Sequence, residues 1–310
     1  MRSPVLDGTC SAAARDLDEP LAGTAPVAPA WLVVEQPGPW GRDALTQSHL
    51  DAGVAATLAA RAEPLPVRVL LVRRPGPHPD DHHPTPRTVW TASTVPGATW
   101  LRRHRVEDPR ALLDVDLDAL AAGRPEGGEP EAGPVVFVCT NGRRDRCCAL
   151  RGRDLAAALA ARLGDGRVWE CSHLGGHRFA PTALVLPHGV VHGRLDARSA
   201  AHVVDQAEQG RLALDGYRGR STWDRPGQVA EAVVRTRTGL TGLDDLHVGS
   251  LSPAPDGAPG PVSVPVSARD GRRWTVTVDE REGPTRRPES CERPETPLRW
   301  LEAVTMVPQG

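Results

Sequence analysis

The chain has 310 residues, a length that suffices for two domains with hydrophobic cores of their own. Its formal net charge at pH 7 is -2, which gives no electrostatic reason to expect nucleic acid or an anionic membrane as a partner. No stretch approaches the roughly 18 apolar residues of a membrane-spanning helix, and the N-terminus lacks the apolar segment of a signal peptide. We therefore expect a cytoplasmic protein.

The first half of the chain predicts an α/β unit. A lead-in rich in proline and alanine, residues 1–30, is expected to be irregular or partly helical. Apolar runs and helical spacing then predict strand 31–35, helix 43–61, strands 67–72, 87–92 and 98–102, and helix 109–121. Three histidines, His78, His82 and His83, lie in a proline-rich stretch that we interpret as a surface loop and not as a metal tract.

The second half repeats this order of elements. It predicts strand 134–139, helix 154–163, strands 167–171, 183–186 and 189–192, and helix 197–209. This order is typical of a thioredoxin-like fold. Residues 121–134 have the Gly, Pro and Glu content of an exposed linker, which indicates a domain boundary.

The C-terminal part predicts a helix followed by a hairpin. Pro226 marks the first turn of a helix that runs to residue 237. Alternating segments 262–266 and 274–278 flank an Asp270-Gly271 turn, and residues 298–307 add a last strand. We interpret this tail as a cover for the second unit and not as a DNA-binding wing, because an acidic run lies beside its arginines.

Two cysteines and two histidines have the composition of a metal site. Cys139 and Cys148 enclose eight residues, and His173 and His177 enclose three. Structural zinc sites usually space their cysteines by two to four residues, whereas a longer loop can wrap a larger inorganic core. In a [2Fe-2S] cluster, two cysteines can hold one iron while two histidines hold the other.

These motifs resemble the sucrase/ferredoxin-like family. The resemblance rests on Cys139-x8-Cys148 followed by His173-Leu-Gly-Gly-His177, and it extends to residues 19–25, 31–41 and 216–228. It implies a thioredoxin-like ferredoxin domain with a [2Fe-2S] cluster. Cys139 and Cys148 would hold one iron, and His173 and His177 the other.

The expected organisation has three parts. The cluster domain spans residues 134–222, and a C-terminal extension with a helix and a hairpin spans residues 223–310. Residues 1–125 form an N-terminal α/β domain that we interpret as a degenerate thioredoxin-like copy. In such a copy Glu35 takes the place of the first ligand, and Trp40 is expected to cover the metal site.

The predicted function is one-electron transfer to or from a redox protein partner, with no catalytic residue and no bound substrate. It is expected to be coupled to protons, because a coordinated histidine keeps a second ring nitrogen that can hold or lose one. Two other interpretations stay open: a thiol-based redox enzyme that uses Cys147 and Cys148, and a structural zinc-binding interaction domain.

Four cysteines remain outside the implied ligand set. Cys147 could replace Cys148 if the loop register were shifted by one residue, and Cys171 is interpreted as a buried strand-end thiol or reserve ligand. Cys10 is interpreted as an incidental thiol, and Cys291 stays unassigned.

Overall fold

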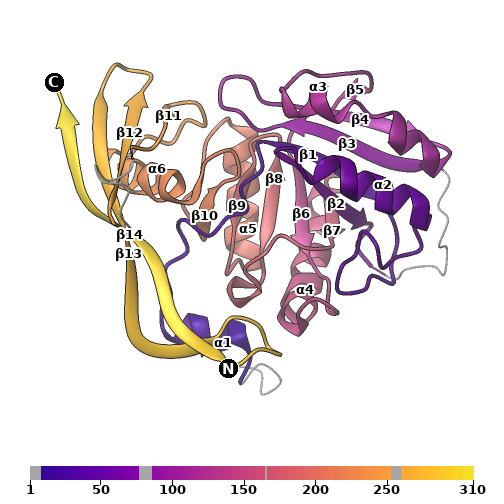
Figure 1. The fold of residues 1–310 in the computed structure, drawn as a ribbon, viewed down its shortest axis with the longest axis horizontal. Helices are drawn as coiled ribbons and strands as arrows, with labels where there is room; N and C mark the ends of the chain where they lie inside the picture. The colour runs from indigo at the N-terminus through magenta and orange to yellow at the C-terminus, as the bar shows by residue number, and fades with distance from the viewer. Residues whose placement is uncertain (1–7, 77–85, 165, 253–259) are drawn as a thin grey trace.

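The computed structural model describes residues 8–76, 86–164, 166–252 and 260–310. It has a mixed α/β architecture with a 10-stranded mixed sheet and a separate 4-stranded antiparallel sheet (Figure 1). The strand order of the large sheet is β10-β9-β8-β6-β7-β2-β1-β3-β4-β5. His78, His82 and His83 lie outside the described residues.

The N-terminal unit has the predicted strands, but its helices differ from the prediction. The expected helix 43–61 begins only at Ala52, because the Asp51 side chain accepts a hydrogen bond from Val54 N at 3.0 Å and so caps the helix there. The expected helix 109–121 is two short pieces, because Asp116 caps a second start. The elements are α1 (Cys10–Asp16), β1 (Ala30–Glu35), α2 (Ala52–Ala62), β2 (Val67–Arg73), β3 (Arg87–Ser93), β4 (Trp100–Val106), η2 (Pro109–Asp114), α3 (Leu117–Ala121) and β5 (Glu129–Pro130).

The second unit contains one correction that matters for the site. Helix α4 begins at Arg146 and not at residue 154, because Asp145 accepts a hydrogen bond from Cys147 N at 2.8 Å. Cys148 therefore lies in the first turn of a helix and not in a loop before it. The elements are β6 (Val135–Cys139), α4 (Arg146–Leu163), β7 (Val168–Cys171), η3 (His177–Phe179), β8 (Ala183–Leu186), β9 (Val190–His192), α5 (Ala197–Glu208) and β10 (Tyr217–Arg220).

The two units have the same strand order and share one sheet. The order is β2-β1-β3-β4 in the first unit and β7-β6-β8-β9 in the second, and in each unit the first pair is parallel and the others are antiparallel. Each unit contributes its outermost parallel strand to the junction, β2 from the first unit and β7 from the second. These two strands pair antiparallel, with Val72 opposite Cys171 and Arg73 opposite Glu170. The predicted linker is not free, since its residues 129 and 130 form β5 beside β4.

One hydrophobic core extends across both units. Trp90 of β3 makes edge contacts with Phe137 of β6 and Trp169 of β7, at ring-centroid distances of 5.7 and 4.9 Å. Strands β3 and β6 are separated by three strands in the sheet order, so the sheet must curve to bring one face of each unit together. Cys139, Cys148 and Cys171 belong to this shared core.

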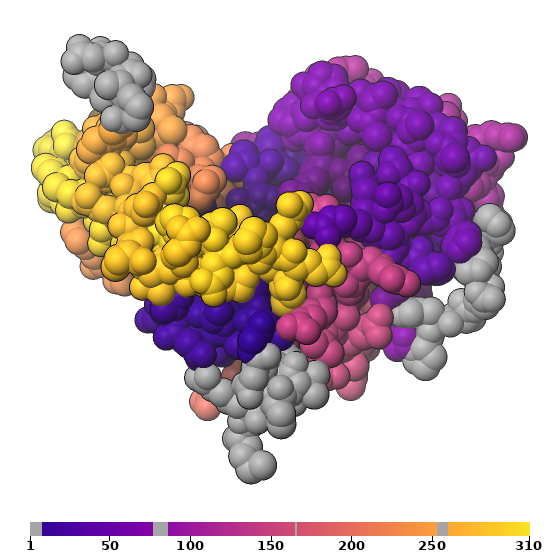
Figure 2. All heavy atoms as spheres, turned by 60° about the horizontal axis from the view of Figure 1, so that its bottom comes forward, coloured from indigo at the N-terminus to yellow at the C-terminus, as the bar shows by residue number. Residues whose placement is uncertain are grey.

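The C-terminal part forms the second sheet and a long arm. The predicted hairpin is confirmed as β12 and β13. Strand β13 and the predicted last strand, β14, pair with each other, and at 16 and 15 residues they extend well beyond the apolar pattern. Charged pairs such as Arg281 with Glu302 join them in the outer part. The arm crosses the N-terminal segment and reaches the second unit (Figure 2). The elements are α6 (Arg225–Thr238), β11 (Leu246–Val248), β12 (Val262–Ala268), β13 (Arg273–Pro288) and β14 (Glu295–Gln309).

None of the helices in the described part of the chain has the combination of length and apolarity that crossing a membrane requires.

Candidate metal centres

The four predicted ligands are here called the thiol–imidazole set. Cys139 is the last residue of β6, and Cys148 lies in the first turn of α4. His173 follows β7, and His177 begins η3. Because β6 and β7 are parallel neighbours, their carboxyl ends lie at the same edge of the sheet, and Cys139 pairs in register with Cys171. The fold therefore presents all four residues from one sheet edge.

Two arginines hold the histidine loop. Arg68 donates from Nη2 to the His173 carbonyl at 2.9 Å, and the buried Arg218 donates from Nη1 to the Gly175 carbonyl at 3.1 Å. Leu174 anchors the loop in the shared core. Gly176 has a φ of +66°, and a Cβ at this position would collide with the Arg218 guanidinium. The glycine is therefore needed both for the left-handed conformation and for the close approach of the arginine.

The inner ring nitrogens of the two histidines are unsatisfied. Nδ1 of His173 and Nδ1 of His177 are both buried and have no hydrogen-bond partner among the described residues. Their rings stack at a centroid distance of 5.2 Å. A buried nitrogen without a partner costs about 1–3 kcal/mol, so an arrangement of two such atoms needs a reason. Coordination to a metal would supply one.

Of the thiols beside the histidines, Cys139 is the one whose surroundings stabilise the deprotonated form. Hydrogen bonding with Cys148, and then with Cys171, holds the pKa of Cys139 well below its usual range, and the pKa of Cys148 is raised correspondingly. Burial lowers the pKa of His177, while the charge of the nearby Cys139 acts in the opposite direction. A thiolate and neutral imidazoles are the protonation states in which these groups bind metals. The donor set therefore fits a metal or an iron–sulfur cluster.

Cys171, the last residue of β7, also contacts this set through Cys139. It is fully buried, and its pKa is raised, chiefly by burial and then by its hydrogen bond to Cys139. This position is compatible with both interpretations made from the sequence.

A second cluster of thiols was not expected. The Sγ atoms of Cys10, Cys147 and Cys291 lie 3.5, 3.2 and 3.6 Å from one another, and a carboxylate oxygen of Asp145 lies 3.6 Å from Cys10 Sγ. We call these four residues the thiol–carboxylate cluster; their ligand atoms all lie within 4.8 Å of one another. This finding corrects the interpretation of Cys10 as incidental. Because its members are up to 281 positions apart, no local spacing could reveal the cluster.

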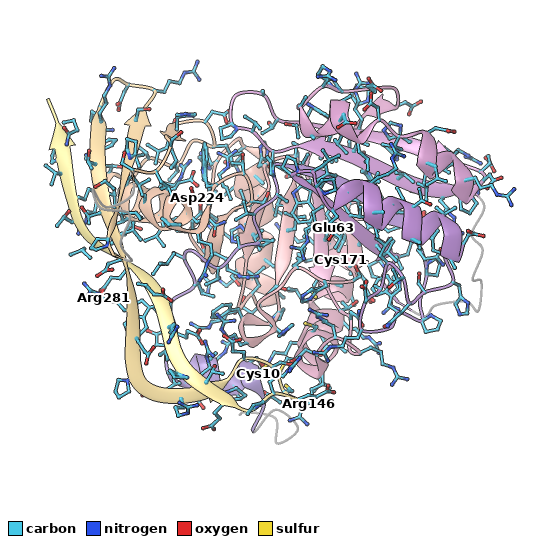
Figure 3. All side chains as sticks on the ribbon, in the orientation of Figure 1. Cys10, Glu63, Arg146, Cys171, Asp224 and Arg281 are labelled. Atoms are coloured by element: carbon cyan, nitrogen blue, oxygen red, sulfur yellow. The ribbon has the colours of Figure 1, made fainter. Side chains whose placement is uncertain are left out.

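The thiol–carboxylate cluster joins three parts of the fold. Cys10 begins α1, and Cys291 lies in the turn between β13 and β14. Asp145 caps α4, and Cys147 lies in the first turn of that helix. Figure 3 shows Cys10 and Arg146 close together at the end of the arm, with Cys171 farther into the body of the molecule. Hydrogen bonds from Cys10 and Cys291 lower the pKa of Cys147 to about 3.

The adjacent cysteines Cys147 and Cys148 belong to different clusters. Cys148 packs with Cys139 in the shared core, whereas Cys147 packs with Cys10 and Cys291. This arrangement supports Cys148 as the ligand of the thiol–imidazole set. It also argues against a redox enzyme in which Cys147 and Cys148 act as one pair.

Trp40 does not cover the thiol–imidazole set as expected. It packs in the core between the N-terminal sheet and α2, with Arg73 over its ring at 4.4 Å. Its neighbour Gly41 does contact the loop between the two cysteines, since its carbonyl accepts from Asn141 Nδ2 at 3.0 Å.

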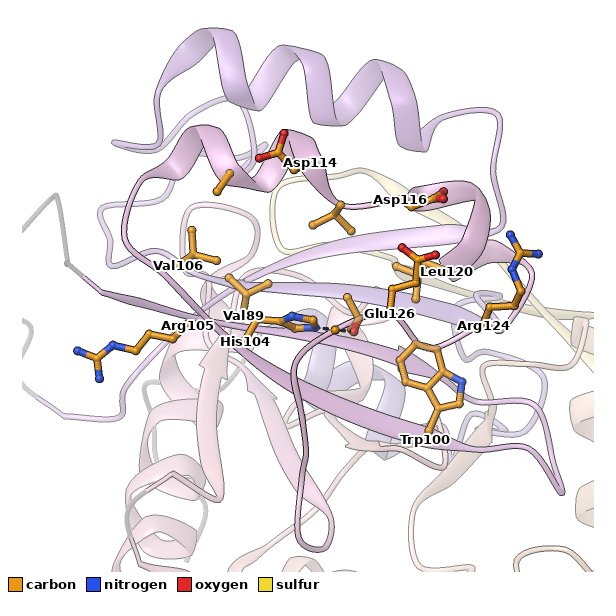
Figure 4. A pocket seen from close by; sticks show the side chains of 14 residues that line it. Val89, Trp100, His104, Arg105, Val106, Asp114, Asp116, Leu120, Arg124 and Glu126 are labelled. Carbon is orange, nitrogen blue, oxygen red and sulfur yellow. Dashed lines mark hydrogen bonds between the residues drawn. The ribbon is translucent and has the colours of Figure 1, made fainter.

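A pocket of about 350 Å³ lies in the N-terminal unit between β3, β4 and the η2–α3 segment (Figure 4). Its walls include Val89, Trp100 and His104, and His104 Nε2 lies 2.9 Å from the Thr91 hydroxyl. Burial lowers the pKa of His104, and Arg102 adds to this effect. None of the cysteines lines this pocket, so it is separate from both clusters.

Comparison with known proteins gives one finding. A family model described as sucrase/ferredoxin-like matches residues 21–219, which is more than half of the chain. The matched range includes the whole thiol–imidazole set, but it excludes Cys10 and Cys291. Searches of curated proteins and of solved structures returned no match.

Proposed function

The chain belongs to the sucrase/ferredoxin-like family, and from this premise we propose that it is a one-electron carrier with a [2Fe-2S] cluster held by Cys139, Cys148, His173 and His177. When bound, such a cluster accepts and releases a single electron. A redox-related role is what the family suggests; the ligands and the cluster type are our proposal.

The observation that carries the proposal is the pair of buried, unpartnered Nδ1 atoms beside two buried thiols. Nδ1 of each histidine is the nitrogen that we assign as ligand. Both side chains are only half-buried as a whole, so the opposite nitrogen, Nε2, can be the one that exchanges protons. The predicted proton coupling would depend on that atom.

The chain's own residues set the position and the electrostatics of the site. Arg68 and Arg218 bind carbonyls of the histidine loop. These hydrogen bonds fix the backbone from which the two imidazole side chains project. The same two side chains bring positive charge close to the site, and the charge of Cys139 acts on Arg68 and on Arg218. Positive charge near a cluster stabilises the added electron and raises the reduction potential.

The matching strand orders of the two units support the thioredoxin-like assignment and the proposal that the first unit is a degenerate copy. In that alignment β1 corresponds to β6, and Glu35 takes the place of Cys139 at the strand end. Glu35 accepts a hydrogen bond from Thr88 N at 2.8 Å and offers no thiolate. The copy would therefore serve packing and not cluster binding.

Iron and sulfide analysis of the purified full chain tests the cluster. We expect about two irons per chain and visible charge-transfer absorption. Alanine at any one of the four ligands should remove most of the iron, because each change deletes a direct bond to it. The matched control is Cys291→Ala, which removes a cysteine that packs with the other group of thiols and should retain iron. A colourless chain free of iron after anaerobic purification and reconstitution would overturn the proposal.

Potentiometry tests the ligand type and the proton coupling. The reduction potential should fall as pH rises, by about 59 mV per pH unit where one proton accompanies the electron. His173→Cys should retain a cluster with a lower potential, since thiolate donates more charge than imidazole. A potential that is independent of pH between about 6 and 10 would remove proton coupling from the function.

The electron-transfer partner and the cytoplasmic location stay predictions. Arg143 and Arg146 are exposed beside the first turn of α4, where a protein with an acidic surface could dock close to Cys148. Loss of electron transfer to an acidic partner at high salt would be the expected sign of such docking.

A further inference from the structure

We propose that Cys10, Cys147, Cys291 and Asp145 form a tetrahedral zinc site that fastens the C-terminal arm to α1 and α4. This site is distinct from the thiol–imidazole set and does not depend on the proposed electron transfer. Zinc is the metal to expect because structural zinc sites are closed, four-coordinate and rich in thiolates, and because zinc also accepts a carboxylate oxygen as a ligand.

The distances fit one small ion. With zinc–sulfur bonds of about 2.3 Å, tetrahedral geometry places two sulfur atoms about 3.8 Å apart. The three sulfur–sulfur distances, 3.5, 3.2 and 3.6 Å, are only a few tenths of an ångström shorter. The Asp145 carboxylate, at 3.6 Å from Cys10 Sγ, lies at the distance expected of a fourth ligand. Small outward shifts of the side chains would accommodate the ion.

The carboxylate is already held in place. One oxygen of Asp145 accepts from Cys147 N at 2.8 Å, and the other accepts from Cys291 N at 2.8 Å and from Ser290 Oγ at 2.9 Å. Such hydrogen bonds orient metal ligands and offset part of their negative charge. Asp145 is 2 % exposed, so an oriented, buried carboxylate faces three thiols. A cation is the partner that this combination lacks.

A purely apolar role does not explain the cluster. Buried cysteines often behave as small hydrophobic residues, and three of them could simply pack together. However, a buried carboxylate beside them is unfavourable unless it is compensated. Binding of zinc releases the thiol protons and replaces them with a divalent charge. A disulfide would join only two of the three sulfurs and would leave the third thiol and Asp145 unused.

The site would connect parts of the chain that lie far apart in the sequence. Besides the cluster, the end of the arm is held by a buried ion pair in which Arg287 donates to Glu19 at 2.8 and 2.6 Å. Zinc would add a link between residues 10, 147 and 291. Because Cys147 precedes Cys148, the same link would restrain the first turn of α4, which presents Cys148 to the other site.

Two of the four residues lie outside the range that matches the family. Cys10 precedes residue 21 and Cys291 follows residue 219. The inferred zinc site therefore combines Asp145 and Cys147, which lie in the matched range, with one residue from each of the two parts that the family model does not cover.

Zinc and iron are measured together in the full chain to test the site. We expect about one zinc per chain. Cys291→Ser and Cys10→Ser should lose at least nine-tenths of the zinc while keeping the iron, and His173→Ala should lose iron while keeping zinc. Glu292→Gln, an exposed change next to Cys291, is the matched control and should retain zinc.

X-ray absorption at the zinc edge of the unmodified chain gives a readout that does not depend on a variant folding. We expect three sulfur neighbours at about 2.3 Å and one oxygen at about 2.0 Å. A chain that neither contains zinc nor binds added Zn²⁺ would overturn the proposal. A disulfide between two of the three cysteines would also overturn it. The same holds if the His173→Ala variant loses its zinc while the Cys291→Ser variant keeps it. In each case the iron content reports separately on the electron-transfer proposal.

Discussion

At the scale of single residues, helix geometry places two adjacent cysteines, Cys147 and Cys148, in different surroundings. Successive residues of an α-helix point about 100° apart, so adjacent side chains face different surroundings. Cys147 and Cys148 stand in the first turn of α4, and they contact different groups of cysteines. Two adjacent cysteines of the sequence therefore belong to two separate groups of thiols in the structure.

His192 should make the stability of the chain depend on pH. It is 1 % exposed, and burial lowers its pKa to about 4, although the Asp215 carbonyl, 2.8 Å from Nδ1, acts in the opposite direction. In the unfolded chain the pKa is near 6.5, so between pH 6.5 and about 4 the unfolded state binds a proton that the folded state does not. Stability should therefore fall as pH falls through this range, by up to roughly 3 kcal/mol.

Denaturant unfolding at pH 7 and pH 5 measures this effect. In His192→Gln the difference between the two pH values should shrink by about 2 kcal/mol, because the titrating group is gone. His202→Gln is the control, since that side chain is 52 % exposed on α5. An unchanged pH dependence in His192→Gln would contradict the prediction.

At the scale of elements, the contact between α4 and β6 sets the distance between two proposed ligands. Gly152 of α4 lies directly against the end of β6, and a Cβ on it would overlap the carbonyl oxygen of Cys139. The helix can approach this closely only because that position has no side chain. Cys148, one turn earlier on the same helix, depends on this approach for its distance from Cys139.

Gly152→Ala should therefore reduce iron binding. In an exposed helix the change would stabilise by about 1 kcal/mol, but here the overlap should cost about 1–3 kcal/mol and displace α4 from Cys139. Iron content and unfolding free energy are measured together. Ala157→Gly, exposed on the same helix, is the control: it should destabilise by about 1 kcal/mol and keep its iron. Full iron content in Gly152→Ala would show that the close contact does not position Cys148.

At the scale of the whole molecule, one buried ion pair crosses the junction between the two units. Arg73 of β2 donates from Nε to Glu170 of β7 at 2.9 Å, and the Thr140 hydroxyl donates to the same carboxylate at 2.8 Å. The two charged side chains are 8 % and 3 % exposed. Edge strands β2 and β7 share only a short ladder, so this pair contributes to joining the units.

Arg73→Met should destabilise the chain by roughly 3–5 kcal/mol, because it removes a hydrogen-bonded positive charge from beside a buried carboxylate. The double change Arg73→Met with Glu170→Met should recover most of that loss, since two apolar side chains can replace a buried ion pair at little cost. Unfolding free energies of the single and double variants form the test. A double variant less stable than Arg73→Met would show that Glu170 has another role at the junction.

The sequence by itself predicted most of the strands, the hairpin and the four proposed ligands of the thiol–imidazole set. Strands β1, β2, β3, β6, β7 and β8 follow from short apolar runs, and the hairpin from its alternation and its Asp-Gly turn. The proposed ligands of the thiol–imidazole set come in two pairs, each pair close in the sequence, so their spacing could be recognised. Such features are local, and local patterns can be read without knowing the path of the chain.

Only the tertiary structure decided how the parts meet. Two features have no spacing signal in the sequence: the β2–β7 pairing that merges the two units, and the arm that carries Cys291 to Cys10. The arm's outer strands are charged, so they lack the apolar alternation that would have predicted their length. Contacts between residues 10, 145 and 291 depend on every turn between them, because chain entropy and packing act on the whole molecule and not on a sequence window.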